Sequence, residues 1–170
     1  GADYKKLRPE LKTSTNYETD ATIGSFAFFT TLKLKTKPVT ASLMGIYAQN
    51  ATDLVMLGGY AVSEETDLLR RYKEYTNINT GNLWLDLATN GTRVAFGLFT
   101  GYSRNLGSPE VITGTVYGRG SDIDHLFRIS PRVIFTSGKL SFGTEVETTT
   151  AAYGNMEDNV RVSVIHNVAN

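Results

Sequence analysis

The sequence of 170 residues lacks several features that would indicate particular functions. It has no cysteine, which excludes disulfide bonds and thiolate chemistry. It has only two histidines, His125 and His166, so a histidine-rich metal site is excluded. No run of about 18 apolar residues occurs, so a transmembrane helix is excluded. The charges balance at 17 basic and 17 acidic residues, which does not favour nucleic-acid binding.

What the sequence does contain is alternation of apolar and polar residues. Helical periodicity is scarce, whereas runs with a period of two recur along the whole chain. We therefore predict an all-β protein with a single domain over residues 1–170. The expected strands are Leu7–Tyr17, Ile23–Thr36, Val39–Gln49, Tyr72–Ala88, Arg93–Ser103, Asp124–Thr136, a segment from Leu140 to Thr148, and Val160–Asn170.

The alternation around Ser137-Gly138 predicts a hairpin with two unlike faces. If the chain turns at Thr136–Lys139, Phe135 faces Leu140 and Ile129 faces Val146 on an apolar face. A slip of one residue would exchange the faces of both strands, so the pattern constrains the pairing strongly. On the polar face the predicted pairs are Arg128 with Glu147, Ser130 with Glu145, and Arg132 with Gly143.

Two further turn signals, Lys37-Pro38 and Asn90-Gly91, predict hairpins at the same end of the sheet as Ser137-Gly138. Asn-Gly favours a type I′ turn, in which both central residues have positive φ. Long loops are then expected at the opposite end, over Ala51–Arg71, Asn105–Ile123 and Ala151–Asn159. Long strands with short turns at one end and long loops at the other are typical of an antiparallel up-and-down transmembrane β-barrel.

Periodicity does not decide which face is wet, because a soluble barrel and a membrane barrel differ only in orientation. The spacing of aromatic residues favours the membrane. Phe127 and Phe135 are eight residues apart on the apolar face, which is about 20 Å of height at a tilt near 40°. This is close to the separation of the aromatic girdles around a bilayer-facing band. We therefore expect the apolar face to contact lipid and the polar face to line the interior.

Part of the chain also resembles a known family. The segments Asp86–Gly107, Tyr117–Lys139, Glu145–Gly154, Leu57–Val62 and Tyr47–Asn50 are similar to the C-terminal half of porin-like outer-membrane barrels of Bacteroides-type bacteria. The most specific piece is Arg128-Ile129-Ser130-Pro131-Arg132-Val133 followed by Ser137-Gly138-Lys139. Members of the family are longer, so the resemblance implies that N-terminal strands are missing here. The chain departs from the pattern in ending at Asn170 rather than at an aromatic residue.

The resulting hypothesis is a channel segment in a bacterial outer membrane that passes small polar solutes by diffusion. Its expected partners are outer-membrane lipid and the missing strands of the same barrel or other subunits of a homo-oligomer, without nucleic acid. A complete eight-stranded barrel is the alternative to a segment of a wider one. A soluble barrel that binds an apolar ligand is the alternative function, and its pocket would be lined by Phe26, Phe28, Leu32, Leu85, Phe96, Val133 and Phe142.

Alternation also predicts which residues line the pore. This set has more basic than acidic members, which suggests a slight preference for anions. The alternative is a filled lumen in which the same groups form structural cross-strand pairs. The predicted pore-lining residues are Lys33, Lys35, Trp84, Asp86, Arg93, Arg128, Arg132, Glu145, Glu147 and Arg161.

Signals for catalysis are weak. Asp122, Asp124 and His125 lie where a long loop meets a strand, and an acid–base site could use such a group. A solvated loop, with aspartate as a turn former, explains the same residues. Nucleophile-elbow and P-loop sequences are both absent. We expect no enzyme activity, no cofactor and no metal site.

Overall fold

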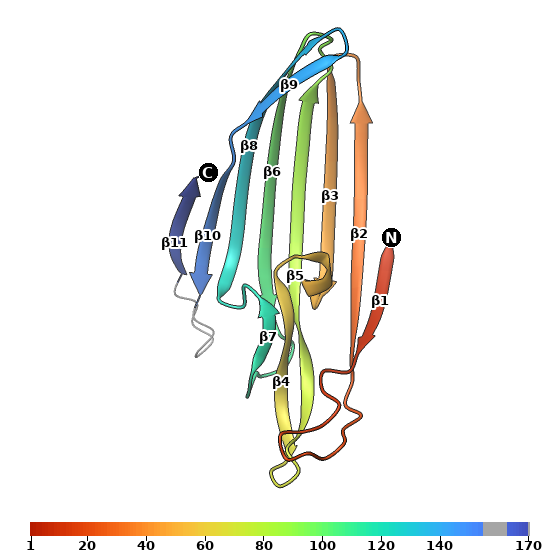
Figure 1. The fold of residues 1–170 in the computed structure, drawn as a ribbon, viewed down its shortest axis with the longest axis vertical. Coiled ribbons are helices and arrows are strands. Elements are labelled where there is room, and N and C mark those ends of the chain that lie inside the picture. Colours follow the sequence, from red (N-terminus) through yellow and green to blue (C-terminus); the bar gives the residue numbers. More distant parts are fainter. Residues whose placement is uncertain (155–162, 170) are drawn as a thin grey trace. The chain divides into compact units, whose positions relative to one another are not determined.

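The computed structural model describes residues 1–154 and 163–169, and in them the chain is all-β. Figure 1 labels its strands in the order in which they follow one another along the chain. The elements are β1 (Ala2–Leu7), β2 (Ile23–Lys35), β3 (Val39–Gln49), the 3₁₀ turn η1 (Ala51–Leu54), β4 (Gly58–Asp67), β5 (Tyr72–Thr89), β6 (Val94–Gly107), β7 (Val116–Arg119), β8 (Ile123–Ser137), β9 (Leu140–Glu145), β10 (Thr148–Gly154) and β11 (Ser163–Ala169).

The strands form an antiparallel up-and-down sheet, as predicted. Its neighbours follow the order β1-β2-β3-β5-β6-β8-β10-β11 in the described part of the chain. Three strands lie off this path: β4 pairs with β5 and β7, and β9 pairs with β8. The path begins at β1 and ends at β11, so closure of the sheet into a barrel stays a prediction.

Contacts divide the chain into two compact units. Unit 1 comprises residues 1–28, 47–81 and 105–121, and unit 2 comprises residues 29–46, 82–104 and 122–170. Strands β2, β3, β5 and β6 pass through both units. The expectation of a single domain over residues 1–170 stays a prediction, and each unit is described by itself.

The central strands match their predicted ranges closely, whereas the prediction of a strand over Leu7–Tyr17 is wrong. The first strand, β1, ends at Leu7. Beyond it, the Asn16 N–H donates to the Thr13 carbonyl, the Tyr17 N–H donates to the Thr13 hydroxyl, and Asn16 has a φ of 66°. A local turn therefore takes up backbone groups that a strand would have used in its ladder.

Two of the predicted loops also contain strands, β4 and β7, which pair with each other in unit 1. Glycine makes this pairing possible. A Cβ atom at Gly59 would lie 2.2 Å from the Tyr117 carbonyl oxygen, and Gly59 has a φ of 156°. Strand β10 likewise extends to Gly154, into the third predicted loop. Of the last predicted strand, Val160–Asn170, residues 160–162 and 170 lie outside the described residues.

The β8–β9 hairpin forms with a register two residues away from the predicted one. Phe135 pairs with Phe142 rather than Leu140, and Ser137 pairs with Leu140. The turn is the two residues Gly138-Lys139, and Gly138 at its first position has a φ of 61°, as a type II′ turn requires. The predicted partner strand is interrupted at Val146-Glu147, after which β10 continues along β8 (Figure 1).

The three short turns of unit 2 lie together at one end, as predicted. The Asn90 N–H donates to the Pro38 carbonyl at 2.8 Å, and the Thr136 N–H donates to the Arg93 carbonyl at 2.7 Å. The prediction of a type I′ turn at Asn90-Gly91 is wrong, because neither residue has a positive φ and four residues connect β5 to β6. Asn90 is instead held by the neighbouring β2–β3 turn, which overrides its local preference.

Candidate functional site

The sheet of unit 2 has one apolar face, and the register of β6 with β8 defines it. From Val94 to Tyr102, most of the side chains that lie opposite one another on this face are large and apolar, and the polar pair Arg104 with His125 follows. The pairs are Val94 with Phe135, Phe96 with Val133, Leu98 with Pro131, Thr100 with Ile129, and Tyr102 with Phe127. Successive residues of a strand point to opposite faces, so these pairs share one face of the sheet.

This apolar face is uncovered in the described part of unit 2. Phe96 and Phe142 remain 61% and 67% exposed, and Leu32 on β2 remains 67% exposed. The residues proposed to line a dry pocket in a soluble barrel are thus at the surface: Phe26, Phe28, Leu32, Phe96 and Phe142 are exposed, and Leu85 and Val133 are half-buried. A water-soluble monomer rarely exposes so large a contiguous apolar surface.

An ion pair lies on the opposite face of the sheet. The Arg132 guanidinium on β8 donates to the Asp86 carboxylate on β5 at 2.8 Å, and both side chains are about one quarter exposed. Strand β6 runs between β5 and β8. Arg132 pairs with Gly97 of β6, where a Cβ atom would lie 2.5 Å from the arginine Nε. The missing side chain at Gly97 therefore lets Arg132 cross β6 to reach Asp86.

An aromatic pair accompanies this ion pair on the polar face. The rings of Trp84 and Phe99 lie 6.0 Å apart in a tilted arrangement, within the range of favourable aromatic contacts. Gly101 lies beside them, since its Cβ atom would come within 3.4 Å of the Phe99 ring. The polar face is not purely polar, because Phe29 and Ile134 also lie on it by alternation.

A second group of charges connects β8 to the last residue of β9 and to the segment that follows it. The Ser130 hydroxyl donates to the Glu145 carboxylate at 2.6 Å, and Arg128 lies 3.4 Å from Glu147. Arg128 also donates to the Thr149 hydroxyl at 3.1 Å. The predicted side-chain contacts of Arg128 and Ser130 therefore occur although the backbone register differs. Arg132 is the exception, because it contacts Asp86 rather than lying over Gly143.

The remaining predicted pore-lining residues lie outside the contacts described above. Lys33 and Lys35 are exposed on β2, beside the β2–β3 turn. The prediction that Arg93 lies on a strand is wrong, because the connection between β5 and β6 is longer than expected and Arg93 is part of it. Arg161 lies outside the described residues. The pore-lining role of the whole set stays a prediction.

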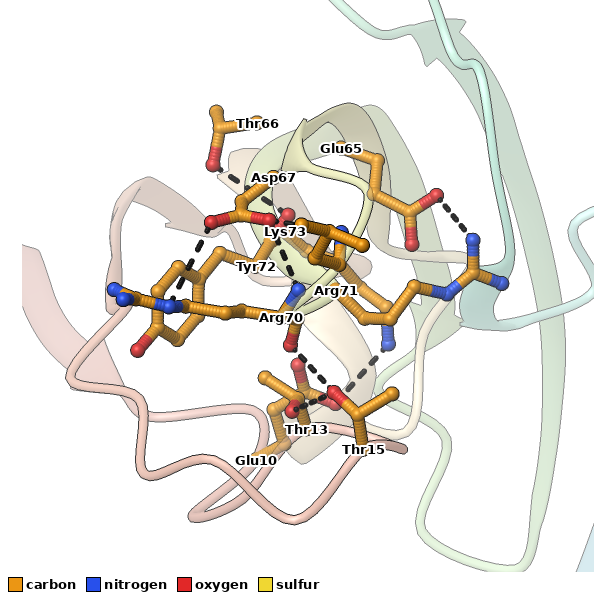
Figure 2. Close-up of polar contacts among 11 residues, drawn as sticks. Glu10, Thr13, Thr15, Glu65, Thr66, Asp67, Arg70, Arg71, Tyr72 and Lys73 are labelled. Atoms are coloured by element: carbon orange, nitrogen blue, oxygen red, sulfur yellow. Dashed lines mark hydrogen bonds and ion pairs between the residues drawn. The ribbon is translucent and has the colours of Figure 1, made fainter.

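In unit 1, polar contacts fix the N-terminal segment to the turn between β4 and β5 (Figure 2). Lys73 forms an ion pair with Glu10 at 3.1 Å, and the Thr15 hydroxyl donates to the Arg70 carbonyl at 2.9 Å. The Asp67 carboxylate accepts the backbone N–H groups of Leu69 and Arg70 within the turn. These contacts explain how an irregular segment is held without a strand ladder. The alternation of apolar and polar residues does not indicate these contacts.

A second tether of unit 1 joins β1 to η1. The Lys5 ammonium donates to the Asn50 carbonyl and to the Asp53 carboxylate. The hydrogen bond from Lys5 is the main cause that lowers the pKa of Asp53 below its ordinary value. Asn50 and Val55, on either side of η1, both have left-handed backbones, which bend the chain sharply at this point.

The acidic residues near His125 form only a small group. The Asp124 carboxylate lies 2.9 Å from His125 Nδ1, and the Tyr102 ring lies 5.6 Å from the imidazole. Asp122 is exposed, and its carbonyl accepts the Gly154 N–H. Among the side chains that the structure describes, within residues 1–154, no group of three or more histidine, aspartate or glutamate residues is placed to hold a metal ion.

Comparisons of the chain with family models, curated proteins and solved structures give no match. Nor do the residues that the structure describes include a helix with the length and apolarity needed to cross a bilayer. The two faces of the sheet are therefore the features from which a function can be inferred.

Proposed function

We propose that this chain is a segment of a porin-like outer-membrane channel that passes small polar solutes by diffusion and catalyses no reaction. The observation that carries the proposal is the uncovered apolar face of unit 2. A strand can cross a bilayer when its apolar residues face lipid and its polar residues face the interior of a closed barrel. Closure, with further strands or copies of the chain completing the barrel, is part of the proposal.

The length of the apolar band supports this proposal. The cross-strand pairs at the two ends of this band, Val94–Phe135 and Tyr102–Phe127, are eight residues apart along each strand. At about 3.4 Å per residue and a tilt near 40°, this is about 20 Å of height. Aromatic residues lie at both ends, with Phe135 at one and Tyr102 and Phe127 at the other. Aromatic girdles bound the lipid-facing band of outer-membrane barrels in this way.

The pairing of charges on the other face changes the expected selectivity. Arg132 is neutralised by Asp86, and Arg128 lies beside Glu147. A paired cation attracts a passing anion less than an isolated one, because its partner repels the same ion. We therefore expect these two arginines to contribute little to ion preference, in contrast to the selectivity suggested by the sequence.

Planar-bilayer conductance of the purified chain, folded in detergent and reconstituted, tests the proposal. Discrete current steps that persist across several salts are the expected result. A folded, monodisperse sample in buffer without detergent would contradict the membrane location and favour the soluble, ligand-binding barrel. Membrane insertion without current would indicate a plugged or structural barrel and would overturn the channel function.

A further inference from the structure

The short-turn end of unit 2 has a concentration of positive charge. Segments 33–41, 87–95 and 134–143, which meet there, contain five basic residues and no acidic one: Lys33, Lys35, Lys37, Arg93 and Lys139. All five are exposed. The hydrogen bonds from Asn90 to Pro38 and from Thr136 to Arg93 hold the three turns side by side. Within the described residues, none of the five forms an ion pair.

A hollow of about 740 Å³ opens at the same end, between the start of β6 and the β8–β9 hairpin. Arg93 lines one part of it, together with Ser137 and Gly138 of the β8–β9 hairpin. Thr92 and Thr136 also line it, and the apolar part of the lining is formed by Val94, Phe135, Leu140 and Phe142. Cross-strand pairing places Val94 opposite Phe135 and Phe135 opposite Phe142, so this lining continues the apolar face described above.

We infer that this hollow, here called the turn-end groove, binds an anionic phospholipid. Arg93 in the lining and Lys139, which lies between the lining residues Gly138 and Leu140, contact the headgroup phosphate, and the four apolar side chains contact the first part of an acyl chain. The inference rests on the membrane location in the proposed function, but not on conduction. It gives Arg93 a role in binding lipid, whereas the sequence predicted that this residue lines the pore.

The combination of charge and apolar surface favours lipid over a soluble anion. A soluble phosphate compound would be attracted by the cations alone and would leave the apolar lining in water. Leu140 is 74% exposed, so this lining lacks cover within the described residues of unit 2. At the edge of a bilayer, basic side chains reach the phosphates while adjacent apolar groups contact the acyl chains. Each Lys or Arg near the membrane surface adds to the attraction of a basic cluster to anionic lipid.

Lipid retention measures this binding. The full chain is folded in detergent and reconstituted into nanodiscs that contain equal amounts of phosphatidylglycerol and phosphatidylcholine. It is then re-extracted, and the lipids that remain bound are counted by native mass spectrometry. We expect at least fivefold more phosphatidylglycerol than phosphatidylcholine on the native chain. The double variant Arg93→Gln with Lys139→Gln should lose this preference, and Leu140→Asn should retain less of both lipids.

The matched control is Lys6→Gln with Lys12→Gln, which removes two exposed lysines of unit 1. It should keep the native preference, and circular dichroism checks that each variant is folded. Equal retention of both lipids by the native chain, or a preference unchanged in the Arg93/Lys139 variant, would overturn the inference. So would full competition by glycerol phosphate, which would indicate a soluble phosphate site. A chain that conducts without lipid preference contradicts only this inference, whereas one that retains phosphatidylglycerol without conducting contradicts only the channel.

Discussion

Arg132 of β8 and Asp86 of β5 form an ion pair of 2.8 Å across the strand that separates them. The contact depends on a third residue, Gly97 of β6, over which the arginine side chain passes. Two strands that do not pair with each other are thereby connected on the polar face.

Replacement of Gly97 by alanine should disrupt the ion pair. The new Cβ atom would lie 2.5 Å from Arg132 Nε and 2.8 Å from its Cγ, so the arginine must move away from Asp86. We expect a loss of about 1–2 kcal/mol in the free energy of unfolding, measured by urea titration of the detergent-folded chain. The matched control is Gly143→Ala on β9, whose Cβ atom would make an ordinary contact of 3.6 Å with Ile134. Equal losses for the two variants would contradict the steric argument.

A double-mutant cycle should separate the two arginine contacts of the polar face. For Asp86→Asn and Arg132→Gln we expect a coupling free energy of about 1 kcal/mol, because the pair is close and partly buried. For Glu147→Gln and Arg128→Gln we expect no more than about 0.5 kcal/mol, because that pair is longer, at 3.4 Å, and more exposed. Both cycles use urea titration. A larger coupling free energy for the Arg128 pair would show that the exposure of the side chains does not determine which ion pair is stronger.

Two adjacent residues of β2 distinguish a lipid-facing from a water-facing surface. Leu32 lies on the apolar face and Thr31 on the opposite one, and both are exposed. If the apolar face contacts lipid, Leu32→Arg should destabilise the chain by about 2 kcal/mol in lipid bilayers, because arginine is costly in hydrocarbon. Thr31→Arg should then change the stability little. Urea unfolding in liposomes gives both values, and similar small effects for the two variants would contradict lipid contact.

Asn90 should stabilise the short-turn end more than a typical turn residue. Its side-chain amide donates to the Thr36 carbonyl at 2.8 Å, and its side-chain oxygen accepts from the Thr40 hydroxyl at 2.9 Å. We expect Asn90→Ala to cost about 1–2 kcal/mol in the free energy of unfolding, since two hydrogen bonds are lost. Thr92→Ala, two residues away in the same connection, is the control and should be nearly neutral. Comparable losses for both would assign the effect to the turn backbone.

The tether between Lys5 and Asp53 should weaken in acid. The folded chain holds the pKa of Asp53 below the ordinary value of 3.8, so the unfolded chain binds the proton more readily. The carboxylate therefore stabilises the folded chain above pH 3.8, and this contribution falls as the pH drops through the lowered pKa. Stability measured from pH 6 downward should decline less steeply for Asp53→Asn than for the native chain. Parallel curves for the two chains would contradict this linkage.

The two faces of the sheet could be predicted from the sequence, because side chains of a strand alternate with a period of two. The β8–β9 register shows why this prediction is robust. The pairing differs from the predicted one by two residues, and a shift of an even number leaves every side chain on the same face. Phe127, Ile129 and Phe135 therefore lie on the predicted face although their partners differ.

Local patterns failed where contacts distant in sequence decide the structure. Asn90-Gly91 favours a type I′ turn by itself, but bonds to residues 36–40 hold Asn90 in another conformation. The segment after Leu7 alternates like a strand, yet its backbone turns at Asn16 and is fixed by contacts with the β4–β5 turn. Strand β7 was missed because its four residues pair with a strand far away in the sequence.

By itself, the sequence determined that the chain is all-β, which residues share a face, and that the short turns lie at one end. These properties follow from the geometry of a single extended strand and from the number of strands between turns. Only the tertiary structure decided the register, the partner of Arg132 and the groove beside Arg93. They depend on which side chain is absent at Gly97 and on how separate turns bond, and neither is encoded in any one segment.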